Sequence, residues 1–156
     1  MTSQSAYYYL KARWQLIAVS FLAIGFFLFA SVFNFKSQDD DFVKWLSPDE
    51  TANYVIARNY ATTGSLMFFE KYNVVSKELI HPRSFRSDWG WIKPVSFIGL
   101  PLYYGAIARL FGIGILPYLT PLIGAIGIIF FYLFVKELFS KNTGLIAAAL
   151  LAVFPV

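Results

Sequence analysis

Hydrophobic and polar residues follow one another along this chain in long blocks, and the first block is the clearest. Residues 14–35 read WQLIAVSFLAIGFFLFASVFNF, a run of 22 residues without a charge. A helix of that length spans roughly 33 Å at 1.5 Å per residue. This is enough to cross the hydrocarbon core of a bilayer, which is about 30 Å thick. The block therefore predicts a membrane helix.

The residues in front of this block predict its orientation. Lys11 and Arg13 precede it, and basic residues favour the cytoplasmic side of a membrane. Trp14 suits the interface between membrane and water. A cleaved signal peptide is the rival interpretation, but its apolar core would hold only about 7–15 residues and would end at an A-x-A type of site. We expect an uncleaved anchor with a cytoplasmic N-terminus.

Three further apolar blocks follow in the second half of the chain. Residues 95–116 are apolar except for Arg109, which lies near the far end and can extend to cytoplasmic headgroups. Residues 119–135 form another span. Residues 144–156 begin an apolar helix whose 13 residues are too few to cross. The pattern predicts an all-α polytopic membrane protein with three full membrane helices and a truncated fourth, and we expect it to be the N-terminal part of a larger protein.

A polar block, residues 36–93, separates the first and second predicted spans and is expected to be a large loop on the outer face. Residues 48–63 within it are predicted to be a helix. Ser47 suits the N-cap position, and Pro48 suits the first helical position. Residues 64–75 fit either a turn and a short strand or a stretch at the membrane surface.

The composition agrees with a membrane protein and excludes several kinds of site. Hydrophobic residues make up 58% of the chain and charged residues only 14%, whereas a soluble domain carries about 25% charged residues. The net charge of +4 comes from 13 basic and 9 acidic residues. These charges are not clustered as nucleic-acid binding requires, so no nucleic-acid partner is expected. There is no cysteine, and His81 is the only histidine, which excludes disulfides, thiolate sites and multi-histidine metal sites.

An adjacent acid pair, Asp49 and Glu50, opens the predicted helix. Glu50 stands three residues after Ser47, which is the S-x-x-E spacing of a capping box. Asp49 carries the charge that a helix N-terminus favours. Local physics alone therefore explains both residues as a helix cap. The same position holds a carboxylate rigidly near the bilayer surface, where it can take a proton from an acceptor hydroxyl or amine. The two interpretations do not exclude each other.

A cationic segment lies at the end of the same loop. Its cations are Arg83, Arg86 and Lys93, with His81 able to protonate. Arginine can hold phosphate oxygens through paired hydrogen bonds, and lysine acts as a point charge, so the segment can bind a lipid-linked phosphate. The alternative is a solvated basic loop that rests on anionic headgroups. Trp89 and Trp91 suit either the membrane interface or the face of a sugar.

The order of these parts resembles the GT-C class of membrane glycosyltransferases, in particular the branch of dolichyl-phosphate-mannose protein mannosyltransferases and aminoarabinose transferases. The shared pattern begins with one membrane helix and an outer loop that opens with an acid pair, here SPDETANYVIARNYATTGSL at 47–66. A Lys-Pro then enters the second span, here WIKPVSFIGLPLYYGAIARLFG at 91–112. A further span, a short basic turn and an Ala/Leu-rich helix that ends in proline follow at 124–155. The resemblance covers residues 14–155.

The resemblance implies that a sugar passes from a polyprenyl-phosphate donor to a lipid, glycan or protein acceptor. The transfer would take place at the outer or lumenal face of the plasma membrane or the endoplasmic reticulum. Asp49 would be the catalytic base, Glu50 would support it, and Lys93 would meet the lipid phosphate. Some relatives use a divalent metal, so a metal stays open, and no other cofactor is expected. Members have many more membrane helices, so this chain alone is expected to be inactive.

Another class of function stays open beside the enzyme. The family often has two prolines after the lysine, whereas this chain reads Lys-Pro-Val at 93–95. The alternative is a non-enzymatic membrane subunit, an anchor or part of a transporter, in which Asp49 and Glu50 only cap a helix. The transporter is the weaker form of this alternative because no acid lies inside a predicted span.

Overall fold

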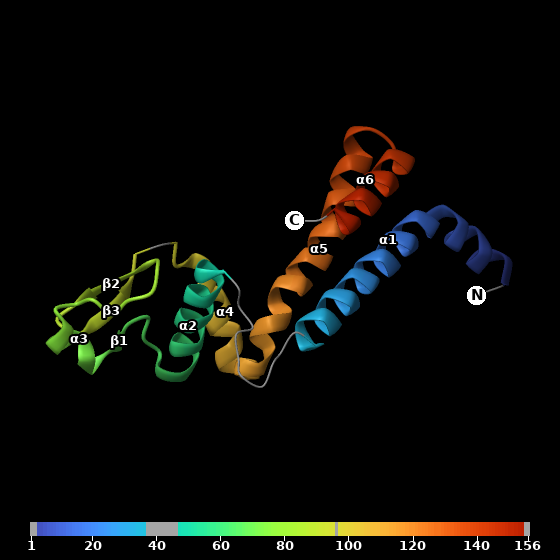
Figure 1. Cartoon of the computed structure of the whole chain (residues 1–156). Coiled ribbons are helices and arrows are strands. Elements are labelled where there is room, and N and C mark those ends of the chain that lie inside the picture. Colours follow the sequence, from blue (N-terminus) through green and yellow to red (C-terminus); the bar gives the residue numbers. More distant parts are fainter. Residues whose placement is uncertain (1–2, 37–46, 96, 155–156) are drawn as a thin grey trace. The chain divides into compact units, whose positions relative to one another are not determined.

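The computed structural model describes residues 3–36, 47–95 and 97–154, with side chains from Trp14 onward, and is mostly helical (75%). The elements in chain order are α1 (Ser3–Lys36), α2 (Pro48–Thr63), β1 (Phe68–Phe69), α3 (Lys71–Ser76), β2 (Phe85–Asp88), β3 (Trp91–Pro94), α4 (Gly99–Phe111), the 3₁₀ turn η1 (Ile113–Ile115), α5 (Leu116–Leu138) and α6 (Lys141–Val153), as Figure 1 shows. The chain divides into two compact units. The helical unit holds Met1–Lys36 and Thr120–Val156, and the loop unit holds Ser37–Leu119.

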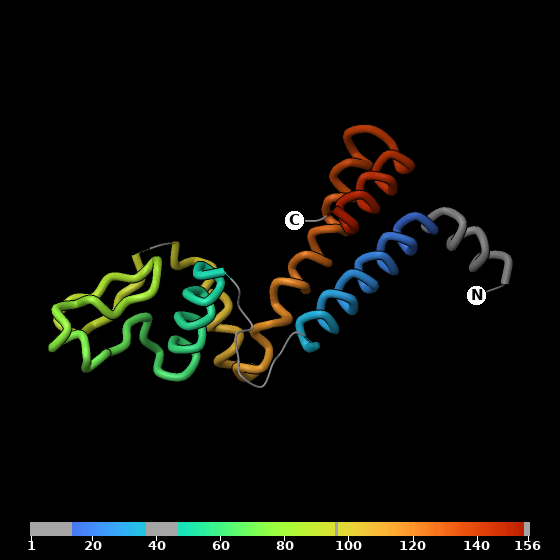
Figure 2. The backbone as a smooth tube through the Cα atoms, viewed as in Figure 1, coloured from blue at the N-terminus to red at the C-terminus, as the bar shows by residue number. Residues whose placement is uncertain are grey.

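The helical unit joins α1 to the later part of α5 and to α6, which runs back along α5 (Figure 2). Its buried core consists of Val19 and Ala23 from α1, Ala125, Ile128 and Tyr132 from α5, and Ala148 from α6. A polar contact adds to this core, because Gln15 Nε2 donates a hydrogen bond to Asn142 Oδ1 at 2.7 Å. Small residues and buried side-chain hydrogen bonds are the means by which helices associate in lipid.

Two helical segments are long and apolar enough to cross a membrane, Trp14–Lys36 and Ile113–Leu138. The first agrees with the predicted helix over residues 14–35. Its apolar side chains largely face outward: Phe21 is 72% exposed and Phe29 is 75% exposed. A helix with an apolar outer surface needs an apolar solvent or a partner, so this surface is suited to lipid.

The second predicted span, residues 95–116, is wrong as a single membrane helix. α4 begins at Gly99 and ends at Phe111, and its 13 residues span roughly 20 Å, which is short of the core thickness of about 30 Å. Gly112 ends the helix with φ 92° and ψ 156°, values outside the helical region. Three full membrane spans are therefore not found among the described residues. The apolar pattern misled because it records hydrophobicity but not the break at glycine.

The remaining boundaries shift by a few residues. The third predicted span, 119–135, lies within the longer α5. The fourth helix was predicted over 144–156, but α6 begins at Lys141 because the Ser140 hydroxyl accepts a hydrogen bond from Thr143 N and caps it. Residues 155 and 156 of that prediction lie outside the described residues.

Arg109 was expected to extend from the end of a membrane helix to cytoplasmic headgroups, but it does not belong to such a helix. It belongs to the loop unit, and a Cβ built at Gly64 would meet its Nη1 at 3.2 Å. Gly64 is the C-cap of α2. The guanidinium therefore lies at the carboxyl end of α2, where a positive charge is favourable to the helix dipole.

The loop unit contains a small sheet, so the all-α prediction is wrong for this part of the chain. Three short antiparallel strands are arranged in the order β1-β3-β2. Phe68 pairs with Ile92, and Arg86 pairs with Lys93. Strands of two to four residues carry too little alternation to be distinguished from loops in the sequence. The expected turn and short strand within residues 64–75 is confirmed as β1, although α3 follows it directly.

α2 is the centre of the loop unit, with the sheet on one side and α4 on the other (Figure 1). On the sheet side, Ala52 and Ile56 pack with Phe85 and Ile92. On the α4 side, a second cluster holds Ala57, Ala108, Leu116 and Leu119. The α4 contact is close: a Cβ at Gly105 would lie 2.8 Å from the carbonyl oxygen of Ala57. Both faces of α2 are thus fixed by packing, which holds its N-terminus, and the acid pair on it, in a defined place.

Candidate functional site

The amino end of α2 has the cap that the sequence predicts. Ser47 is extended, with φ −92° and ψ 136°, and its backbone N–H donates to Glu50 Oε2 at 3.4 Å within a capping box. Thr51 N donates to the carbonyl of Ser47 at 3.0 Å and closes the first helical turn. The helix covers Pro48–Thr63, as predicted, and Gly64 ends it in the left-handed conformation. Glu50 is therefore used by the cap.

Asp49 has a different contact, which reaches a distant part of the chain. It is exposed, and its Oδ1 accepts a hydrogen bond from the Ser84 hydroxyl at 3.0 Å, across 35 residues. Ser84 has φ 68°, a conformation uncommon for residues other than glycine. The end of the sheet holds it there, because Ser84 O accepts a hydrogen bond from Val95 N at 3.0 Å. An unusual backbone conformation held in place by its surroundings is a feature found often at functional sites.

This hydrogen bond attaches the acid pair to the cationic segment. Ser84 directly follows Arg83, and both Arg83 and His81 are exposed to solvent. His81 Nδ1 lies 3.4 Å from the carbonyl oxygen of Pro82, within its own segment. The fold therefore brings Asp49 to the start of the cationic segment, residues 81–84, which is what a phosphate-dependent reaction at this acid would require.

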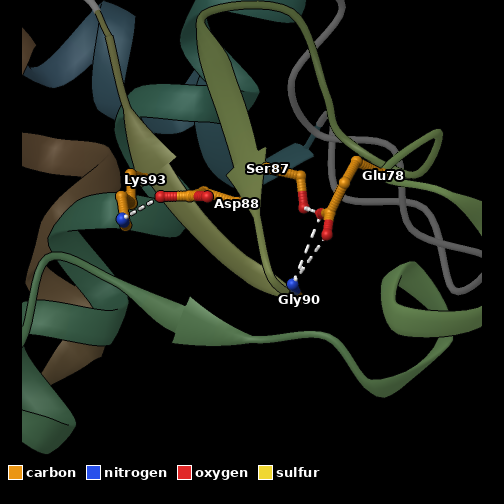
Figure 3. Close-up of polar contacts among 5 residues, drawn as sticks. All are labelled: Glu78, Ser87, Asp88, Gly90 and Lys93. Atoms are coloured by element: carbon orange, nitrogen blue, oxygen red, sulfur yellow. Dashed lines mark hydrogen bonds and ion pairs between the residues drawn. The ribbon is translucent and has the colours of Figure 1, made fainter.

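The other two predicted cations lie on the sheet. Arg86 and Lys93 are direct cross-strand partners, so their side chains share one face. Lys93 Nζ forms an ion pair with Asp88 Oδ2 at 2.8 Å (Figure 3). The hydrogen bond and charge of Lys93, assisted by the charge of Arg86, hold the pKa of the Asp88 carboxyl below its ordinary 3.8, and the slight burial of Asp88 opposes them.

Lys93 and Arg86 are not directed at Asp49. Ile92 packs against Ala52 and Ile56 of α2, and successive residues of a strand point to opposite faces, so Lys93 belongs to the face opposite Ile92. Arg86 shares that face because it is paired with Lys93. Of the predicted site residues, the fold therefore brings together Asp49 and the segment with His81 and Arg83. It places Arg86 and Lys93 apart from them.

Lys93 also lines an open hollow near the carboxyl end of α2. The hollow has a volume of about 520 Å³ and is lined mainly by apolar atoms. Its residues are Tyr60, Gly64, Ser65, Leu66, Met67, Lys93 and Pro94. Asp49 stands 11 positions before Tyr60 on α2, which corresponds to roughly 17 Å along the helix. The hollow and the acid pair are therefore separate features of the loop unit.

Two positioning residues were missed by the sequence reasoning, Ser84 and Asn73. Asn73 is completely buried, and its Nδ2 donates to the carbonyl of Ile80 at 2.7 Å and to Ser87 Oγ at 2.8 Å. Its Oδ1 accepts from Ile80 N at 2.7 Å. Neither residue has a sequence signal, because an asparagine or serine among polar residues is typical of any exposed loop.

A carboxylate supports the same region from the other side. Glu78 accepts hydrogen bonds from the Ser87 hydroxyl and from Gly90 N, the latter at 3.1 Å to Oε1 (Figure 3). With Asn73, it fixes the backbone between α3 and β2, which carries the cationic segment. Within the described ranges 3–36, 47–95 and 97–154, no three His, Asp or Glu side chains gather as a metal site would require.

Comparisons of this chain with protein-family models, with curated proteins and with solved structures found no match. The resemblance to GT-C glycosyltransferases therefore rests on the order of motifs in the sequence, and the activity it implies remains a hypothesis.

Proposed function

We propose that this chain forms part of an integral membrane glycosyltransferase that uses a polyprenyl-phosphate sugar. The donor sugar passes to a lipid, glycan or protein acceptor at the outer or lumenal face of the plasma membrane or the endoplasmic reticulum. The N-terminus is cytoplasmic, and residues 36–93 lie on the outer side. Two helical segments of membrane-crossing length, one before the loop unit and one that begins at its end, support the membrane part of this proposal.

The observation that carries the proposal is the hydrogen bond between Asp49 and Ser84. The capping box is complete with Ser47 and Glu50, so helix capping alone does not require a contact from Asp49 to a residue 35 positions away. The contact leaves the second carboxylate oxygen of Asp49 at an exposed helix N-terminus, beside the segment that carries His81 and Arg83. This is the pairing of base and phosphate-binding groups that the reaction needs.

In the proposed reaction, the acceptor oxygen or nitrogen attacks the anomeric carbon of the sugar. The bond from that carbon to the phosphate oxygen breaks, and polyprenyl phosphate leaves with the bonding electron pair. Asp49 takes the proton from the acceptor, and the anomeric configuration inverts. His81 and Arg83 are placed to stabilise the phosphate charge, since they lie in the segment that Ser84 ties to Asp49.

Lys93 and Arg86 are proposed to bind a phosphate at a second place, away from Asp49. Lys93 is held by Asp88, but both side chains are about two-fifths exposed, at 40% and 44%. Exposed ion pairs contribute only about 0–1 kcal/mol, so a phosphate can replace Asp88 as the partner of Lys93. These cations can meet the phosphate of a lipid on the outer face of the sheet, rather than the phosphate next to Asp49.

The second candidate is a non-enzymatic membrane subunit, anchor or transporter part. The complete capping box at α2 favours it, because Glu50 has a structural role that accounts for its presence. In that case Asp49 only interacts favourably with the helix dipole and accepts the hydrogen bond from Ser84.

The two candidates are separated by Asp49→Asn in the protein as its gene encodes it, assayed for sugar transfer from polyprenyl-phosphate donors. Asparagine keeps the shape and an oxygen for Ser84 but cannot take the proton. We expect a loss of about 100-fold or more, the usual range for a general base. The control is Glu70→Gln, a matched change at the acid that caps α3. Transfer by Asp49→Asn at the wild-type rate would eliminate the enzyme role given to this residue.

A further inference from the structure

The turn between β2 and β3 has an unusual residue at its tip. Asp88 pairs with Trp91, so only Trp89 and Gly90 connect the strands. Their φ values are 51° and 80°, which define a turn with two left-handed residues. Such turns favour Asn-Gly or Gly-Gly, because a bulky residue is strained in this conformation. Trp89 nevertheless occupies the position and is 83% exposed. Within the described residues its ring contributes little packing to offset that strain.

Other aromatic side chains lie next to this tip on the face of the sheet opposite Ile92. Phe69 pairs with Trp91, and their rings meet edge to face with centroids 5.5 Å apart. Both remain about half exposed, at 51% and 45%. Gly90 is fitted closely beneath them, since a Cβ there would lie 2.7 Å from the Phe69 ring and 2.9 Å from Val74. The tip is thus a rigid apolar edge rather than a loose loop.

A row of cations follows the aromatic row on the same face. Arg86 and Lys93 stand two positions further along their strands than Asp88 and Trp91. Two residues of a strand cover roughly 7 Å. The order from the tip inward is therefore apolar and aromatic first, and cationic second. The interface of a bilayer suits both rows, since tryptophan rings sit at the headgroup level and cations bind the lipid phosphates at the surface.

Asp88, the acid on this face of the sheet, is neutralised from within the fold, whereas Glu78 keeps its charge. Asp88 is paired with Lys93. Glu78 accepts hydrogen bonds from Ser87 and from the backbone of Gly90. Arg86, by contrast, is exposed. On this face Arg86 and Lys93 outnumber Asp88, so its three charged side chains carry a net charge of +1, which complements anionic headgroups.

From these observations we infer that the β2–β3 tip inserts Trp89 and Trp91 into the headgroup region of an anionic leaflet, with Arg86 and Lys93 at the phosphates. The inference does not depend on the glycosyltransferase proposal, since a subunit or an anchor would use the same contact. A bilayer is the surface that the tip is proposed to bind. The sequence supports this, because one helix long enough to cross a bilayer precedes the loop unit and another begins at its end.

The test uses the full chain reconstituted in phosphatidylcholine vesicles with phosphatidylglycerol. A variant that retains Trp89 alone, with the tryptophans at 14, 45 and 91 changed to phenylalanine, is compared in lipids brominated at shallow or deep acyl positions. We expect the shallow bromines to lower Trp89 fluorescence about twofold, as for a ring at headgroup depth, and aqueous iodide to have little effect. Quenching by iodide and not by bromolipid would overturn the inference. If neither iodide nor bromolipid quenched Trp89, protein would cover the tip, and this result would also overturn the inference.

A second variant separates membrane contact from folding. Trp89→Asn places the preferred Asn-Gly pair in the turn, so the hairpin is expected to stay folded or to become more stable. With the tryptophans at 14 and 45 changed to phenylalanine, Trp91 is the reporter, and Trp89→Asn should remove most of the bromolipid quenching of Trp91 that Trp89→Phe retains. Arg86→Gln should reduce that quenching in vesicles with phosphatidylglycerol and not in vesicles of phosphatidylcholine alone. Unchanged quenching of Trp91 after Trp89→Asn would contradict the role given to the tip.

Discussion

Replacement of Asn73 by alanine removes a buried polar side chain that connects several parts of the loop unit. The side chain is completely buried and makes three hydrogen bonds of 2.7 to 2.8 Å, two of them to the backbone of Ile80 and one to Ser87. It therefore holds α3, the loop after it and β2 in one arrangement. Together with Glu78, it fixes the backbone between α3 and β2.

The magnitude follows from those bonds. Each hydrogen bond contributes about 1 kcal/mol net, so three account for about 3 kcal/mol. Ile80 is partly exposed, at 46%, so water can reach its backbone once the amide is removed. The full penalty for buried unsatisfied groups therefore does not apply. We expect Asn73→Ala to lower the stability of the loop unit by about 2–4 kcal/mol, a large share of the usual stability of a domain, about 5–15 kcal/mol.

Amide hydrogen exchange measures this effect where it arises. The N–H of Ile80 donates to Asn73 Oδ1, so its protection reports directly on the contact. A loss of 2 kcal/mol corresponds to exchange about 30-fold faster. The control is Ser76→Ala, because Ser76 Oγ reaches the same Oδ1 only at 3.5 Å and its loss should cost less than about 0.5 kcal/mol. Exchange at Ile80 that accelerates less than about fivefold in Asn73→Ala, a change near 1 kcal/mol, would refute the reasoning.

Two further substitutions test the charges and the packing of the loop unit. Lys93→Met removes the main cause of the lowered pKa of Asp88, so that pKa should rise toward its ordinary 3.8 in a carboxyl-detected NMR titration. Since the native pKa of Asp88 is depressed, the Lys93–Asp88 pair stabilises the fold above pH 3.8, and this stabilisation is lost as the pH falls through the native pKa. If the titration of Asp88 were the same in Lys93→Met as in the wild type, Lys93 would not be its partner. Gly105→Ala should lower the melting temperature of the chain, because its Cβ would lie 2.8 Å from Ala57 O and such overpacking costs about 1–3 kcal/mol. Gly99→Ala, where a Cβ meets nothing within 4 Å, should leave the melting temperature unchanged or raise it, and equal shifts for the two alanines would argue against the close α2–α4 contact.

The sequence predicted α1 and α2 well because their signals are local. α1 needs only a long uncharged apolar run, and α2 needs only the S-P-D-E cap and a glycine at its end. These features act within one element and do not depend on what the element packs against. The same holds for the division into an apolar start, a polar loop and an apolar second half.

The prediction was wrong where the outcome depends on contacts between distant residues. The apolar block 95–116 was expected to cross a membrane as one helix, but it breaks at Gly112, and α4 packs on α2. The sheet was missed because its strands are too short for a pattern. The contact of Ser84 with Asp49 spans 35 residues and leaves no mark in the local sequence. Lys93 was grouped with the acid pair on sequence order alone, and strand alternation places it on the other face of the sheet.

The central claim is that Asp49 performs chemistry in addition to its place at the start of a helix. The direct measurement is the rate of sugar transfer per folded molecule for Asp49→Asn, with hydrogen exchange of α2 recorded on the same sample. The account predicts exchange of α2 close to that of the wild type and a transfer rate lower by about 100-fold or more. A transfer rate that falls only in proportion to the folded fraction, or does not fall, would contradict it and leave Asp49 as a helix cap.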